Sequence, residues 1–221
     1  MNASSYNQPQ TAKKTVLSGT YGPFRNNDPL KVVIFIGLIA AVMLTLFSLL
    51  ARQVIPATIL AKPDHHIAIT LRLIHMAGIT IHILCVPYYC LWLNRSCKNA
   101  WLLNPPKMKA TPAWAVAYYF IPIVSLWKPY RSMLEIRNAS FAMRATLTRL
   151  LPLWWFSWLA FILLTAGQLA GHLSINVEIM AIRDKLASVA DMAGIALNYL
   201  SIAVVVSITN AQNKRASELH T

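Results

Sequence analysis

Long apolar runs separated by short polar connections dominate the chain from residue 31 onward. A bilayer core about 30 Å thick needs about 20 helical residues at 1.5 Å each, and four of the runs reach that length. The first run contains no charged residue, and the third begins with a cluster of tryptophans of the kind that favours the headgroup region. We therefore predict four transmembrane helices, over residues 32–51, 67–93, 151–173 and 186–208.

A fifth apolar run, WAVAYYFIPIVSLWKPY over Trp114–Tyr130, is harder to assign. The 14 residues from Trp114 to Trp127 would span only about 21 Å as a helix, which is less than the hydrocarbon core. Pro122 also removes a backbone donor in the middle of the run, and an unsatisfied carbonyl is costly in lipid. Length and proline content both argue against a fifth span.

The distribution of basic residues decides between four and five spans. If the fifth run does not cross, 15 of the 20 lysines and arginines lie on one side of the membrane, whereas a crossing run leaves 10 on each side. Basic residues accumulate on the cytoplasmic side of membrane proteins, so four spans are favoured. We expect residues 112–148 to form a re-entrant or interfacial segment on the cytoplasmic face, with both termini also cytoplasmic.

Composition supports a membrane protein and changes how the charge is interpreted. The chain is 57% hydrophobic and 12% charged, against about 25% charged residues in soluble domains. A net charge of +13 does not predict nucleic-acid binding, because the basic residues lie between apolar runs and not on one soluble face. The predicted fold class is all-α, an integral membrane four-helix bundle over residues 31–210, preceded by a polar, disordered cytoplasmic segment over 1–30 and followed by a cytoplasmic tail over 211–221.

Aromatic and basic side chains alternate in the cytoplasmic-side segment. Arg137 and Arg144 are seven residues apart and would share one face of an amphipathic helix on the inner leaflet. Packing and anchoring is the simpler role, and a docking site for lipid or for a membrane-protein partner is the alternative. The residues expected at the lipid interface are Trp114, Tyr118, Tyr119, Trp127, Lys128, Tyr130, Arg131, Arg137 and Arg144.

The stretch PAWAVAYYFIPIVSLWKPYRSMLEIRNAS, over residues 112–140, resembles the signature of bacterial membrane proteins grouped as domain of unknown function 4328. That family carries a tryptophan-rich WAV and WFIPI pattern, then KPY, an acidic residue and a final AS. The matching positions here are Trp114, Ala115, Val116, Phe120, Ile121, Pro122, Ile123, Lys128, Pro129, Tyr130, Glu135, Ala139 and Ser140. The resemblance extends from about residue 31 to 216 and implies a membrane fold in the bacterial inner membrane, but no chemistry.

Ionisable and amide side chains inside the predicted spans are costly, so they are candidates for function. The second and fourth spans run in the same direction, which places Arg72 and Asp191 at similar depth near the outer surface. A buried ion pair between these two is the first interpretation, and a polar pocket that binds a proton, a metal or a small ligand is the second. The predicted intramembrane polar cluster comprises Arg72, His75, His82, Gln168, His172, Asp191 and Asn198.

Other motifs add little chemistry. Gly167 and Gly171 form a GxxxG pair that permits close helix packing, within the monomer or in a dimer. No pair among the three cysteines has metal-ligand or redox spacing, and we expect no metal site, no cofactor and no catalytic residue. A haem would need a second histidine, such as His172, to face one on the second span.

These observations favour a non-enzymatic membrane protein that acts as a scaffold or interacts within the bilayer with lipids or an unknown partner protein. A small transport or sensing protein that uses the outer polar cluster is the first alternative. A membrane enzyme or haem carrier is the second.

Overall fold

The computed structural model describes residues 18–60, 62, 64–141, 149–173 and 177–219. These residues are almost entirely helical, which confirms the all-α class. Four helices are long and apolar enough to cross a membrane, and each contains one predicted span. They are α1 (Asp28–Val54), α3 (His66–Leu103), α6 (Leu150–Leu173) and α7 (Val177–Glu218), with the short α2 (Ala57–Leu60) between the first two.

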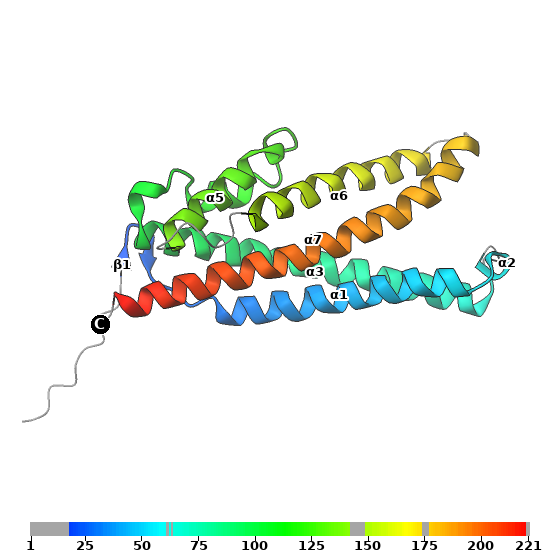
Figure 1. The fold of residues 1–221 in the computed structure, drawn as a ribbon, viewed down its shortest axis with the longest axis horizontal. Helices are drawn as coiled ribbons and strands as arrows, with labels where there is room; N and C mark the ends of the chain where they lie inside the picture. The colour runs from blue at the N-terminus through cyan, green and yellow to red at the C-terminus, as the bar shows by residue number, and fades with distance from the viewer. Residues whose placement is uncertain (1–17, 61, 63, 142–148, 174–176, 220–221) are drawn as a thin grey trace, which may run out of the picture.

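The four long helices form two hairpins that diverge from each other. Helix α1 packs chiefly against α3, and α6 packs against α7, while α7 also packs against α1. The hairpins lie together at the end that carries α5 and separate toward the end that carries α2 (Figure 1). We call the end that carries α5 the closed end; Asn27 and Gln212 lie there. We call the end that carries α2 the open end; Val54 and His66 lie there.

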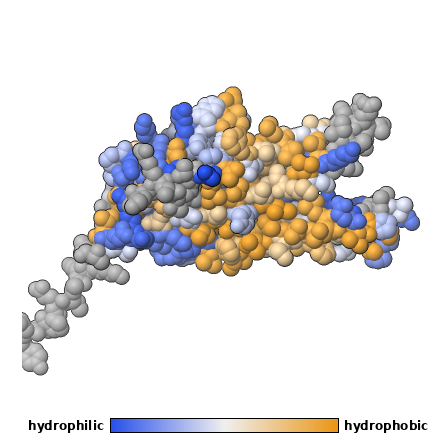
Figure 2. All heavy atoms as spheres, in the orientation of Figure 1, coloured by the Kyte–Doolittle hydropathy of each residue, from blue (hydrophilic) through white to orange (hydrophobic). Residues whose placement is uncertain are grey.

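Helix α7 is the central helix of the bundle. Of its most apolar stretch, 44% is buried within the protein, against 11 to 22% for the other three long helices. The other helices leave large apolar side chains exposed, and these gather in a broad band around the middle of the molecule (Figure 2). Such a band is too large for a soluble monomer and matches the lipid-facing surface of a membrane protein.

Two helices are longer than the predicted spans. Helix α3 has 38 residues and α7 has 42, so at 1.5 Å per residue they reach about 57 and 63 Å, roughly twice the hydrocarbon core. Both continue at the closed end, beyond the predicted span ends at residues 93 and 208. The extensions are helical because their polar side chains are buried against one another.

A network of buried side chains holds the closed end together. Gln212 on α7 donates from Nε2 to the Ser96 carbonyl (2.9 Å) and to Ser140 Oγ (3.0 Å), and its Oε1 accepts from Asn99 Nδ2 (3.3 Å). Asn27, just before α1, donates to Ser96 Oγ at 2.9 Å. The network therefore joins α1, α3, α5 and α7, and each member is 2% exposed or less.

The aromatic segment leaves the closed end and returns to it. It consists of a turn η1 (Pro105–Lys107), α4 (Pro112–Ala117), a turn η2 (Val124–Leu126) and α5 (Lys128–Ser140), none long enough to span a bilayer. Glu135 accepts hydrogen bonds from the backbone N–H groups of Lys109 and Ala110, both at 2.9 Å, so α5 is fastened to the connection that precedes α4. At its end, Ser140 joins the network at the closed end.

The residues before α1 also pack on the closed end. Short strands β1 (Ser18–Gly19) and β2 (Gly22–Pro23) form an antiparallel hairpin whose Gly22 has φ 101°, a conformation that favours glycine. The backbone N–H and carbonyl of Arg25 both bond to the Asn99 side chain, at 3.1 and 2.9 Å. Residues 18–27, part of the segment expected from the sequence to be disordered, therefore pack on the helices.

Glycines permit close helix contacts at two positions, Gly37 and Gly194. A Cβ added at Gly37 on α1 would collide with Sγ of Cys85 on α3, and one at Gly194 on α7 would lie 3.2 Å from Phe161 on α6. At Gly167 the nearest atom would be Leu186 Cδ1, at 3.9 Å, an ordinary contact. The tight approach of α1 to α3 thus depends on Gly37.

We expect Gly37→Ala to lower the free energy of unfolding by about 1–3 kcal/mol, because the added methyl group overpacks the contact with Cys85. Denaturation of the purified protein in mild detergent measures this change. The control Gly167→Ala has room for its methyl group and should change stability little. Replacing Cys85 by Ala in the Gly37→Ala protein should restore most of the loss, and a loss that persists would show that the contact is not its cause.

We expect Gln212→Leu to destabilise the protein by about 2–3 kcal/mol, because it leaves buried partners on α3 and α5 without hydrogen bonds. The same denaturation measurement applies, with the exposed neighbour Lys214→Ala as the control. Equal stability of the two variants would contradict the role given to the network.

Candidate functional site

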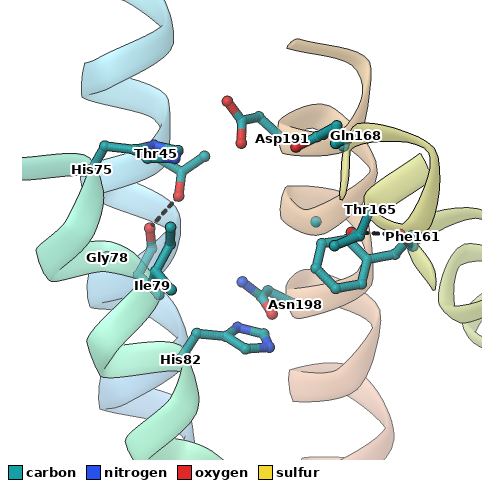
Figure 3. A pocket seen from close by; sticks show the side chains of 13 residues that line it. Thr45, His75, Gly78, Ile79, His82, Phe161, Thr165, Gln168, Asp191 and Asn198 are labelled. Atoms are coloured by element: carbon teal, nitrogen blue, oxygen red, sulfur yellow. Dashed lines mark hydrogen bonds between the residues drawn. The ribbon is translucent and has the colours of Figure 1, made fainter. Parts of the chain in front are cut away.

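The polar side chains predicted inside the membrane meet at a cavity between the two hairpins. The cavity has a volume of about 230 Å³ and is lined by all four long helices. Helices α1 and α3 form one wall, while α6 and α7 form the other (Figure 3). Five members of the predicted polar cluster line it, namely His75, His82, Gln168, Asp191 and Asn198.

Asp191 supplies the carboxylate of the cavity, and its cationic neighbour comes from α1. Its Oδ2 lies 3.7 Å from Nη1 of Arg52, near the open end, and accepts no hydrogen bond from the residues described. The carboxylate points from α7 toward the space between the hairpins (Figure 3). A half-buried carboxylate whose neighbours, Arg52 and His75, form no hydrogen bond with this oxygen retains most of its capacity to bind a cation or a hydrogen-bond donor.

The two histidines of α3 face the cavity at different depths. His75 lies nearer the level of Asp191, and His82 lies deeper, opposite Asn198 across the cavity (Figure 3). His82 also contacts the Phe161 ring, with centroids 6.3 Å apart. Because the two histidines are seven residues apart on one helix, they stand on the same face about two turns from each other.

The prediction of an ion pair between Arg72 and Asp191 is wrong, because the basic partner of Asp191 is another arginine. Arg72 is exposed and is not among the residues that line the cavity, whereas Arg52 is the cation in contact with Asp191. The physical reason is that α7 packs more closely on α1 than on α3, so α1 provides the partner. The side chain of His172 lies outside the described part of the structure.

The cavity side chains do not satisfy one another. Gln168 donates to the Leu186 carbonyl at 3.3 Å, and Thr45 and Thr165 donate to carbonyls of their own helices at 2.9 and 2.7 Å. Among the described residues, no hydrogen bond joins His75, His82 or Asn198 to another side chain. The cavity therefore presents donors and acceptors to whatever occupies it, and it can hold a small cation or a hydrogen-bonding molecule.

The sequence analysis missed Arg52 and the two threonines. Arg52 was assigned to the outer connection because it follows the first apolar run, and only the packing of α1 on α7 brings it to Asp191. The signal for Thr45 and Thr165 is weak, since threonine is common in membrane helices and often bonds to its own backbone. No described group of three or more His, Cys, Asp or Glu side chains has the arrangement of a metal site.

The residues predicted for the lipid interface occupy different environments. Trp114, Trp127 and Arg131 are exposed, and Nζ of Lys128 lies 5.5 Å from the centroid of the Tyr118 ring. Tyr130 packs against Trp155, and Tyr119 against Trp158. Arg137 is only 8% exposed and so lacks the surface position expected for it, while Arg144 lies outside the described residues.

Comparison with known proteins identifies the family but no function. No curated protein and no solved structure matches the chain. The model of one family, described as a domain of unknown function (DUF4328), matches residues 67–210, which include α3, the aromatic segment, α6 and most of α7. The match covers more than half of the chain and agrees with the resemblance noted in the sequence, so the protein belongs to the DUF4328 family.

Proposed function

We propose that this membrane protein binds a small cationic or hydrogen-bonding ligand in the polar cavity between its hairpins and acts in transport or sensing. The observation that carries the proposal is the contrast between the two ends of the bundle. At the closed end, buried polar side chains bond to each other, as in the contacts of Gln212. At the cavity, Oδ2 of Asp191 is buried without a hydrogen-bond partner, and within the described part of the chain no hydrogen bond joins His82 or Asn198 to another side chain.

A purely structural role predicts the opposite arrangement. Polar side chains that only hold helices together pair with one another, because an unpaired polar group in a membrane costs free energy. The cavity carries that cost on two helices, α3 and α7, and a bound ligand would offset it. Arg52, which lies at 3.7 Å from the carboxylate, would be displaced or shared when a cation enters.

The test is a search for ligands by thermal stabilisation of the purified protein, with small inorganic cations and organic amines as probes. A ligand present at a hundred times its Kd stabilises the folded state by about 2.7 kcal/mol. We expect at least one probe to raise the Tm of the wild-type protein and to lose this effect in Asp191→Asn, because the neutral amide removes the attraction for a cation.

The matched control is Arg72→Ala, which removes a charge from the same predicted cluster but not from the cavity wall. This variant should keep the full response to the probe. If no probe stabilises the wild type, or if Asp191→Asn keeps the response, the cavity does not bind cations through this carboxylate. Loss of stability alone in Asp191→Asn would favour the scaffold role.

A scaffold or lipid-interaction role is the second candidate, and the tip of the aromatic segment supports it. Between α4 and α5 the side chains of Phe120, Ile123 and Trp127 are all exposed. Apolar side chains on a segment that starts and ends at the closed end fit a re-entrant element that enters the inner leaflet. In this role Lys128 and Arg131 would meet the lipid phosphates.

We also propose an orientation in which the closed end and both termini lie in the cytoplasm of a bacterial inner membrane. It rests on the accumulation of basic residues on the cytoplasmic side of membrane proteins. In a protein whose three cysteines are replaced by alanine, single cysteines at Asp64, Arg131 and Lys214 are exposed probes of the two ends. A membrane-impermeant maleimide should label Asp64→Cys in intact cells and the other two only after permeabilisation.

Labelling of both Arg131→Cys and Lys214→Cys in intact cells would mean that the aromatic segment crosses the bilayer, because a fifth span also moves the end of α7 to the outside. Reversal of all three patterns would keep four spans but invert the orientation. Asp64→Cys serves as the internal control, since its labelling shows that the protein has reached the membrane.

A further inference from the structure

A second cavity lies directly below the polar one, toward the closed end. It has a volume of about 290 Å³ and shares His82 and Asn198 with the polar cavity. Most of its wall is apolar or aromatic, and the residues that follow α4 close one side. The aromatic residues that line it are Tyr89, Tyr119, Phe120, Trp154 and Trp158.

Three polar groups in this wall are buried without a hydrogen-bond partner. They are the hydroxyls of Tyr89 and Tyr119 and Nε1 of Trp158. The Tyr119 ring packs edge-on against both neighbours, with centroids 6.2 Å from Tyr89 and 5.7 Å from Trp158. The two hydroxyls lie close enough to act on each other as hydrogen-bonding groups, but their geometry falls outside that of a normal hydrogen bond, so the pair retains capacity for a further partner.

Among the described residues, the fully buried donor groups without a partner all belong to this wall. Other indole groups are bonded, since Trp92 donates to Thr209, Trp101 to the Ala110 carbonyl and, in this same wall, Trp154 to Ser201, at 2.9 to 3.0 Å. Buried polar groups in folded proteins nearly always have a partner, so three exceptions on one wall point to a missing acceptor. The missing partner must carry oxygen or nitrogen lone pairs into an otherwise apolar space.

We infer that this cavity binds the ring of a quinone taken from the bilayer. A quinone ring is flat, apolar on its faces and edged by carbonyl oxygens, so it can stack against aromatic walls while it accepts hydrogen bonds from tyrosine and indole donors. A fatty acyl chain would leave the three donors unpaired, and a strongly polar solute would meet an apolar wall. The volume is near the lower limit for ligand pockets and suits one ring better than a whole lipid.

The cavity also has a lipid-facing side through which a chain could leave. Phe120 and Val86 belong to its wall and are 65% and 41% exposed, respectively. In the membrane orientation proposed above, both side chains would face the hydrocarbon. The ring would be held among the donors, and an attached isoprenoid or alkyl tail would extend between these two residues into the lipid.

The test uses the full chain in quinone-free nanodiscs and decylubiquinone as the probe. Its ring is fully substituted, so the thiols of Cys85 and Cys90, which also line the cavity, find no free position for addition. Binding is followed by quenching of tryptophan fluorescence beyond that seen in discs holding an unrelated membrane protein. We expect saturable quenching by the wild-type protein.

Tyr89→Phe and Tyr119→Phe should each weaken binding by about tenfold, which corresponds to one lost hydrogen bond. Neither change should lower the Tm without quinone, because each removes a hydroxyl that has no partner in the empty protein. Tyr130→Phe is the matched control outside the cavity and should keep the wild-type affinity. Asp191→Asn should also keep it, which separates this inference from the function proposed for the polar cavity.

Three results would overturn the inference. The first is quenching of the wild type no greater than that of the unrelated protein. The second is wild-type affinity in both tyrosine variants. The third is a lower Tm in either variant without quinone, which would make the hydroxyls part of the fold and not of a binding site.

Discussion

Gln212 lies where α3, α5 and α7 meet, and its side-chain amide bonds to Ser96, Asn99 and Ser140. Because each buried polar group costs free energy until it is paired, the helices at this end can adopt only the register in which all of these bonds form. That register determines how α7 packs on α1. As a result, the two hairpins are separated at the open end. The cavities thus follow from an arrangement that is set at the closed end, more than 15 residues away along α7 from Asp191.

The position of the aromatic segment depends on the same constraint. Glu135 fastens α5 to the chain before α4, and Ser140 joins the network, so the loop between the two helices is held against the side of the bundle. There Tyr119 and Phe120 complete the wall of the apolar cavity. Glu135, Ser140 and Phe120 are all positions at which the sequence resembles the family signature, so part of that signature has a clear structural use.

The sequence predicted the four spans and the short aromatic segment because length and apolar content decide both, and neither depends on tertiary contacts. It did not predict the helical extensions beyond residues 93 and 208, since Asn99 and Gln212 look like solvent-facing residues until the partners that bury them are known. The cluster of His75, His82, Gln168, Asp191 and Asn198 could be predicted because polar residues within a span are rare. Their ion partner could not, because the choice between Arg72 and Arg52 depends on which helix α7 contacts.

His82 and Asn198 stand at the boundary between the two cavities and belong to the walls of both. Above them the wall carries the polar side chains of the cluster, with Asp191 near Arg52, and below them the wall is mostly apolar and aromatic. A proton or cation held in the upper cavity would change the electrostatic potential at His82, and so would any polar group placed against it from below. Any coupling between ligands in the two proposed sites would pass through these shared residues, and its effect on the two affinities would be reciprocal.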